Sequence, residues 1–163
     1  MAREILYRGK RIDNSEWIEG YYTELPVGSL AATIFSNDDE IVCEDTASYI
    51  IKVFARQHSN YSNSTPLQVM ECEKYKVIPK TIGLYTGLTD KNGKKIFEGD
   101  IVKIEDDNGN TNFSDGGIGD VVFYRGIWYV SGEVHNGLYD LERNYYVSVI
   151  GNIHDNPELL EVE

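Results

Sequence analysis

Cysteine is scarce in this chain of 163 residues, and Cys43 and Cys72 are its only two. They lie far apart in the sequence and form no Cys-x-x-Cys pair, which excludes a zinc ribbon and a thiol-redox motif. We expect two free thiols, buried or half-buried, in a reducing cytosol. A disulfide stays open, because spacing alone does not say whether the two cysteines approach each other.

Long apolar runs are also absent. The N-terminal MAREILYRGKRID has no apolar stretch of signal-peptide length, and no segment approaches the length of a membrane span. We therefore expect a cytoplasmic protein with no membrane partner.

Basic residues are few, with 15 Lys and Arg against 27 Asp and Glu, which gives a net charge of -12. Such a surface repels phosphate backbones, so the composition argues against nucleic acid as a partner. It remains compatible with a small basic patch, and with an acidic protein that mimics nucleic acid.

Signatures of catalysis are missing as well. The chain has no Gly-x-Ser-x-Gly elbow, and its Gly116-Gly117-Ile118-Gly119 lacks the lysine and the helix that a phosphate-binding loop requires. The acidic, glycine-rich segment 105–120 does not place its ligands at the spacing of a calcium loop, so we interpret it as a solvated loop. We expect no enzyme and no cofactor.

The three histidines, His58, His135 and His154, are isolated in the sequence. A metal cluster of Glu133, His135, His154 and Asp155 would require the fold to bring them together. Because no two histidines show ligand spacing, we expect exposed turn residues and no bound metal.

Tyrosine, by contrast, is abundant, with 12 residues beside Trp17 and Trp128. Aromatic and β-branched residues favour strands, and glycine-containing turns separate the apolar segments. Outside the central stretch, the alternation predicts strands at residues 4–8, 16–24, 30–35, 41–43, 67–77, 121–124, 127–130 and 145–153. Gly9-Lys10 and Arg125-Gly126 read as hairpin turns, and Gly20 as a bulge or a close-contact site.

The central stretch, Pro79 to Ile104, reads as strand, turn, short strand, turn, strand. Its first turn is Asp90-Lys91-Asn92-Gly93, because Asn-Gly supplies the positive φ values of a tight turn. Glu98-Gly99-Asp100 forms the second turn. Segment 46–57 is ambiguous between strand and helix, and its β-branched residues favour a strand.

These features predict an all-β fold with several hairpins and a small SH3-like barrel in the C-terminal half. An N-terminal β region would pack on the barrel. One short helical turn closes the chain, since Asn156 can cap it and Pro157 suits its first position.

Three segments carry a family resemblance: REILYRGKRIDNSEWIEGYY, TIGLYTGLTDKNGKKIFEGDIV and VIGNIHDNPELLE. Together they resemble the YopX family of bacteriophages and prophages. The resemblance implies a largely β fold and a phage setting in a bacterial cytoplasm, and it carries over no activity, cofactor or catalytic residue. The segment 28–77 departs most from the family and resembles its variable part. From the pattern of strands and turns we expect an N-terminal β region, 1–80, which contains this variable insertion, and a barrel domain, 81–163, unless both form one continuous domain.

Binding is the function class that remains, and we expect a protein-interaction or accessory assembly module that is able to form a homo-oligomer. The alternatives are a barrel that binds single-stranded nucleic acid and an acidic nucleic-acid mimic acting on a host protein. For the first alternative, Arg8, Lys10 and Arg11 of the first hairpin would join the central turn in one basic patch beside aromatic rings. The candidate binding surface consists of Tyr85, Lys91, Lys94, Lys95, Trp128 and Tyr129.

Overall fold

The computed structural model describes residues 4–26, 46–58, 67–105, 117–131, 136–137 and 147–161. The chain divides into two compact units. We call Leu6–Ile82 the N-terminal unit, and Met1–Ile5 together with Gly83–Glu163 the C-terminal unit. The boundary expected at residue 80 stays a prediction of domain organisation.

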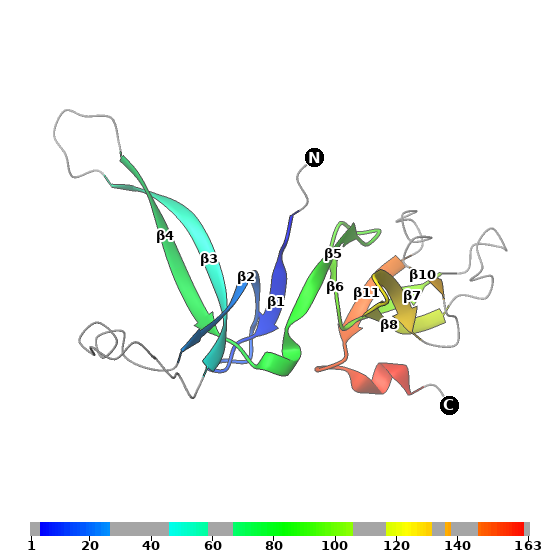
Figure 1. The fold of residues 1–163 in the computed structure, drawn as a ribbon. Helices are drawn as coiled ribbons and strands as arrows, with labels where there is room; N and C mark the ends of the chain where they lie inside the picture. Colours follow the sequence, from blue (N-terminus) through cyan, green and yellow to red (C-terminus); the bar gives the residue numbers. More distant parts are fainter. Residues whose placement is uncertain are drawn as a thin grey trace. The chain divides into compact units, whose positions relative to one another are not determined.

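The N-terminal unit is an antiparallel sheet in the order β4-β3-β2-β1 (Figure 1). Its strands are β1 (Tyr7–Lys10), β2 (Trp17–Pro26), β3 (Thr46–His58) and β4 (Leu67–Lys76), followed by the 3-10 turn η1 (Pro79–Thr81). One face of the sheet buries Ile18, Ile50 and Val77.

A close approach between β2 and β3 explains Gly20. A Cβ at this position would lie 2.4 Å from the carbonyl oxygen of Ile51, so only glycine fits. The close-contact interpretation of Gly20 is therefore confirmed.

The C-terminal unit contains a hairpin of β5 (Gly83–Thr89) and β6 (Lys95–Phe97), and an antiparallel sheet in the order β10-β9-β8-β7-β11. The sheet strands are β7 (Asp100–Ile104), β8 (Gly117–Tyr124), β9 (Ile127–Ser131), β10 (Asn136–Gly137) and β11 (Val147–Asn152). The 3-10 helix η4 (Pro157–Leu160) follows. The core of the C-terminal unit consists of six buried aliphatic residues: Ile96, Val102, Ile104, Val121, Val130 and Val147.

The all-β prediction is confirmed, and segment 46–57 is a strand. The turns around Gly93, Gly99 and Gly126 are confirmed too, since all three glycines have φ between +78 and +85°. The SH3-like barrel is not confirmed, because neither sheet closes on itself among the described strands. The strands expected at 30–35 and 41–43 lie outside the described residues.

Three local predictions are wrong. Gly9 and Lys10 belong to β1, and the turn comes at residues 12–14, because Gly9 packs against the side chain of Val77 instead of bending the chain. Gly117 to Asp120 are the start of β8 and not a loop, since they pair with β7. Asn156 does precede a helical turn, but its side chain makes no capping hydrogen bond.

Candidate functional site

The turn between β5 and β6 is organised by the buried carboxylate of Asp90, which is 3% exposed. Its Oδ1 accepts hydrogen bonds from the backbone N–H groups of Asn92 at 2.8 Å and Lys94 at 2.9 Å. Its Oδ2 accepts a third from the N–H of Val149 on β11, 59 residues away in the sequence, at 3.1 Å. One carboxylate therefore closes the turn and ties it to the sheet.

The charge on Asp90 is stabilised by these donors. Burial alone raises the pKa of the carboxyl group, but the N–H groups of Val149, Lys94 and Asn92 outweigh burial and lower it below its ordinary value. Asp90 is thus a structural anion at neutral pH with its oxygens already engaged, which leaves it poorly placed to act as a general base.

A second buried carboxylate, Asp100, is 1% exposed and closes the next turn. Its Oδ2 accepts a hydrogen bond from the N–H of Phe97 at 2.9 Å. Its Oδ1 accepts one from the side-chain amide of Asn152 at 3.3 Å, and the Asn152 oxygen in turn accepts from the N–H of His154. The polar residues of the central and C-terminal sequence motifs therefore hold the C-terminal unit together.

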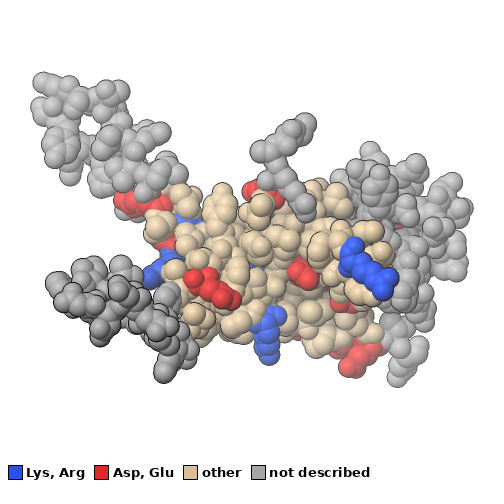
Figure 2. Space-filling view, in the orientation of Figure 1, with Lys and Arg blue, Asp and Glu red and all other residues tan. Residues whose placement is uncertain are grey.

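The candidate lysines of the turn do not gather at one point. Lys91 forms an ion pair with Glu105. Lys95 has its Nζ 3.8 Å from a carboxylate oxygen of Glu4 and 5.4 Å from the ring centre of Tyr85. Lys94 is exposed. Charged side chains are scattered among uncharged ones on the face shown in Figure 2.

Tyr85 is a core residue, 9% exposed, and its ring packs at 5.4 Å against that of Phe97. A buried ring offers no open face for a base or a partner. The first-hairpin cations Arg8, Lys10 and Arg11 belong to the N-terminal unit, so a basic patch shared with the central turn stays a prediction.

Trp128 and Tyr129 are neighbours on β9, and side chains of consecutive strand residues point to opposite faces. Trp128 packs against the apolar core of the C-terminal unit. Its indole N–H is buried and has no hydrogen-bond partner in the described part of the chain. Tyr129 lies on the other face, where its ring meets that of Tyr124 at 6.5 Å. The two residues cannot line one cleft.

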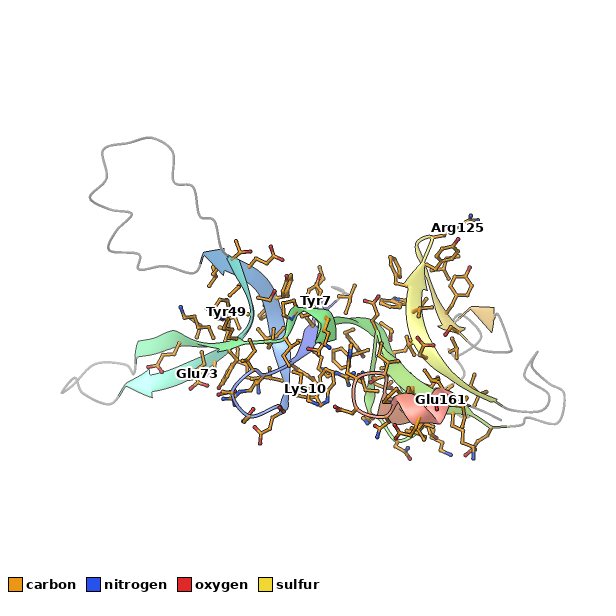
Figure 3. All side chains as sticks on the ribbon, turned by 90° about the horizontal axis from the view of Figure 1, so that it is seen from below. Tyr7, Lys10, Tyr49, Glu73, Arg125 and Glu161 are labelled. Carbon is orange, nitrogen blue, oxygen red and sulfur yellow. The ribbon has the colours of Figure 1, made fainter. Side chains whose placement is uncertain are left out.

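The tip of the β8–β9 hairpin exposes three large apolar side chains that were not among the candidates. Phe123 is 50% exposed, Tyr124 58% and Ile127 49%. They flank the turn of Arg125 and Gly126, and Figure 3 shows Arg125 at the end of this hairpin. The sequence signal was VVFYRGIWYV, which stays apolar on both sides of its turn instead of alternating.

The turn itself has a defined geometry. Arg125 has φ of 52° and Gly126 of 85°, which are the two left-handed conformations of a tight hairpin turn. The guanidinium carbon of Arg125 lies 5.2 Å from the ring centre of Tyr124. Strand alternation places Tyr124 and Ile127, which pair across the hairpin, on one face, whereas Phe123 pairs with Trp128 on the other. The tip therefore exposes an aromatic and an aliphatic side chain beside Arg125 on one face, and a second aromatic ring on the opposite face. We call Phe123, Tyr124, Arg125 and Ile127 the hairpin tip.

The structure describes some of the remaining residues that the sequence singles out, namely the cysteines and the residues of the conceivable metal cluster. Cys72 is a free thiol and is exposed on β4, which corrects the expectation of a buried or half-buried side chain, whereas Cys43 lies outside the described residues. Glu133 and His135 of the conceivable metal cluster also lie outside them. Within the described ranges, no group of three His, Cys, Asp or Glu residues could hold a metal ion. None of the helices described is long and apolar enough to span a bilayer.

Comparison with known proteins identifies relatives of the chain. A family model described as YopX protein matches residues 34–161. The crystal structure of protein EF1440 from Enterococcus faecalis is 23% identical, with a TM-score of 0.52, and the match covers 98% of this chain and 100% of that chain. At this identity the likeness shows a shared fold alone. No curated protein matches the chain.

Proposed function

This chain belongs to the YopX protein family, and we propose that it is a non-enzymatic protein-interaction module, an accessory part of a larger assembly. The exposed hairpin tip is the observation that carries the proposal. Aromatic residues and arginine are the groups most enriched at the energetic centres of protein interfaces. In this chain such residues lie on or beside a two-residue turn whose backbone is already ordered, so binding costs little additional conformational entropy.

The size of the tip indicates the kind of partner. A fully buried aromatic side chain removes about 150–250 Å² from water, so three half-exposed apolar side chains offer roughly 300 Å². Two tips meeting about a two-fold axis would bury about 600 Å² in total, below the roughly 1,200 Å² of a stable interface. We therefore exclude a stable dimer built from two tips alone, and assign the tip to a different protein whose concave apolar pocket encloses both faces of the hairpin and has acidic groups at its rim for Arg125.

The setting we propose is the cytoplasm of a bacterium that carries a phage or prophage. Two observations support it: the family resemblance of the three motifs, and an unpaired, exposed thiol at Cys72, which suits a reducing compartment.

The experiment compares three versions of the protein as baits in a lysate of the host bacterium, with quantitative mass spectrometry of what each retains. Wild type is expected to enrich one partner, and Tyr124→Ala is expected to lose it. Tyr21→Ala is the matched control, because Tyr21 is 57% exposed and belongs to the other unit.

The partner is then purified and titrated into each version by calorimetry. Loss of one hot-spot side chain weakens binding by about 30-fold or more. Equal binding by wild type and Tyr124→Ala would refute the proposal. So would a partner-free chain that sediments as a dimer and becomes a monomer on Tyr124→Ala, since the tip would then bind a second copy.

A further inference from the structure

The sheet of the N-terminal unit has two faces of different chemistry. Its residues alternate between the faces, and the register of β2 and β3 pairs Tyr22 with Ile50 on the core face and Tyr21 with Ile51 on the other. We call this second face the outer face. Tyr49 belongs to the outer face and Glu73 to the core face, and both are labelled in Figure 3.

Charge is segregated between the two faces. Among the described strand residues, the outer face carries four basic side chains and one acidic one: Arg8, Lys10, Lys74, Lys76 and Glu19. By the same register, the core-face positions beyond the apolar cluster are two basic and three acidic residues: Lys52, Arg56, Glu24, Glu71 and Glu73. Arg8 is buried, at 8% exposed, whereas Lys74 and Lys76 are exposed and Lys10 is half-buried. A chain with net charge -12 thus presents one locally positive sheet face, whose accessible cations are lysines.

Aromatic rings share the outer face with these cations. The guanidinium carbon of Arg8 lies 4.7 Å from the ring centre of Trp17, and the Nζ of Lys74 lies 5.5 Å from that of Tyr49. Tyr21, directly opposite Ile51, is 57% exposed. Trp17 and Tyr21 are four residues apart on β2, which is about 13 Å along a strand. Tyr21 and Tyr49 are diagonal neighbours on adjacent strands, about 7–8 Å apart.

We propose that the outer face of the N-terminal unit binds single-stranded nucleic acid. Aromatic rings on an exposed sheet stack unpaired bases, and lysine and arginine beside them contact the phosphates. The spacing of Trp17, Tyr21 and Tyr49 suits two or three bases. An acidic peptide would use the cations but would leave the aromatic rings without a matching group.

The net charge of the chain is no obstacle to binding at this face. At physiological salt the Debye length is about 8 Å, so acidic side chains on the core face are largely screened from a strand lying on the outer face. The composition argued against nucleic acid because it counts charge over the whole chain. The register of the strands shows where the charge lies.

The test is fluorescence anisotropy of a labelled 12-nucleotide oligo-dT, titrated with the full chain between 50 and 200 mM salt. We expect binding at 50 mM that weakens as salt rises. Tyr21→Ala should reduce affinity roughly tenfold, because one stacked base is lost. Tyr124→Ala removes an equally exposed tyrosine from the hairpin tip and should leave oligo-dT binding unchanged.

A second pair of variants separates local charge from total charge. Lys74→Gln and Lys52→Gln each remove one positive charge from adjacent strands, but only Lys74 lies on the outer face. Lys74→Gln should lower the slope of log affinity against log salt by about 0.7, as expected for one lost phosphate contact. Lys52→Gln should leave the slope as it is.

Three results would overturn the proposal. The first is no anisotropy change at 50 mM salt. The second is equal weakening by Lys74→Gln and Lys52→Gln, which would indicate nonspecific attraction. The third is poly-glutamate competing with oligo-dT at equal charge concentration and binding to Tyr21→Ala as tightly as to wild type, which would indicate an acidic protein as the occupant.

Discussion

Replacement of Asp90 by asparagine tests how much this buried carboxylate contributes to holding the central turn on the sheet, beside the backbone hydrogen bond from the N–H of Lys91 to the carbonyl oxygen of Val147 at 2.9 Å. The asparagine oxygen can still accept from the N–H groups of Asn92 and Lys94, which both contact Oδ1. The amide NH₂ then stands where Oδ2 accepted from Val149, so two donors face each other. Asp90→Asn therefore breaks the long-range contact of the side chain and leaves the turn itself and its backbone contact with Val147 intact.

The expected loss of stability follows from that single contact. A hydrogen bond to a charged group contributes about 1.5–3 kcal/mol, and a buried N–H left without an acceptor costs about 1–3 kcal/mol. These figures describe overlapping effects, so we expect Asp90→Asn to lower the free energy of unfolding by about 2–3 kcal/mol. With a urea m-value of about 2 kcal/mol/M, the midpoint should fall by about 1–1.5 M.

The assay uses the two tryptophans, one in each unit. In a Trp17→Phe background, the fluorescence of Trp128 reports unfolding of the C-terminal unit, because Trp128 packs on its core. Glu105→Gln is the matched control: it makes the same change from carboxylate to amide in an exposed ion pair with Lys91. Such surface pairs contribute about 0–1 kcal/mol.

The pH dependence gives an independent check. The pKa of Asp90 is lowered in the folded protein, so its ionisation stabilises the fold above the ordinary pKa of an aspartate, about 3.9. That stabilisation is lost as the pH falls through the lower folded value. The stability gap between wild type and Asp90→Asn should therefore be full at pH 7 and shrink below pH 4. A gap that stays constant down to pH 3, or an equal effect of Glu105→Gln, would refute the structural role of Asp90.

Two further predictions concern glycines of the β8–β9 hairpin. Gly119→Ala should destabilise the C-terminal unit by about 3 kcal/mol or more in the same urea assay, because its Cβ would lie 1.9 Å from the carbonyl oxygen of Ser131. Gly117→Ala, on the same face of β8 with open space around it, should change stability by less than about 0.5 kcal/mol, and equal effects would contradict the clash. Gly126→Ala should cost about 1–2 kcal/mol, since its φ is +85°, and a stabilised variant would exclude a left-handed turn.

Local backbone demands could be predicted from the sequence. Asn92-Gly93 and Arg125-Gly126 are predictable as turns because positive φ is a property of a few consecutive residues. The same rule gives a wrong prediction for Gly9. This glycine serves the packing of Val77, which is 68 positions away in the sequence, and no local signal distinguishes a glycine needed for space from one needed for a turn.

The candidate surface failed for a different reason. Adjacency in the sequence suggests one surface for Trp128 and Tyr129, but strand alternation places adjacent side chains on opposite faces. Which face is the core face is decided by long-range packing, and here the core takes Trp128. Likewise, ECEKYK in β4 already alternates its charges, but only pairing with β3 shows that Lys74 shares a face with Tyr49.

These contacts distinguish buried polar residues that stabilise the fold from exposed aromatic residues that are available for binding. Asp90, Asp100 and Asn152 stand in the sequence motifs, and their polar atoms are engaged in holding turns to strands. A buried group that is already hydrogen-bonded has no capacity left for a partner, whereas exposed rings at Tyr21 and Tyr124 have. The sequence motifs of this chain are therefore explained by the fold that they stabilise. Its binding should be sought on surfaces outside the buried motif contacts, where a substitution such as Tyr21→Ala changes affinity without changing stability.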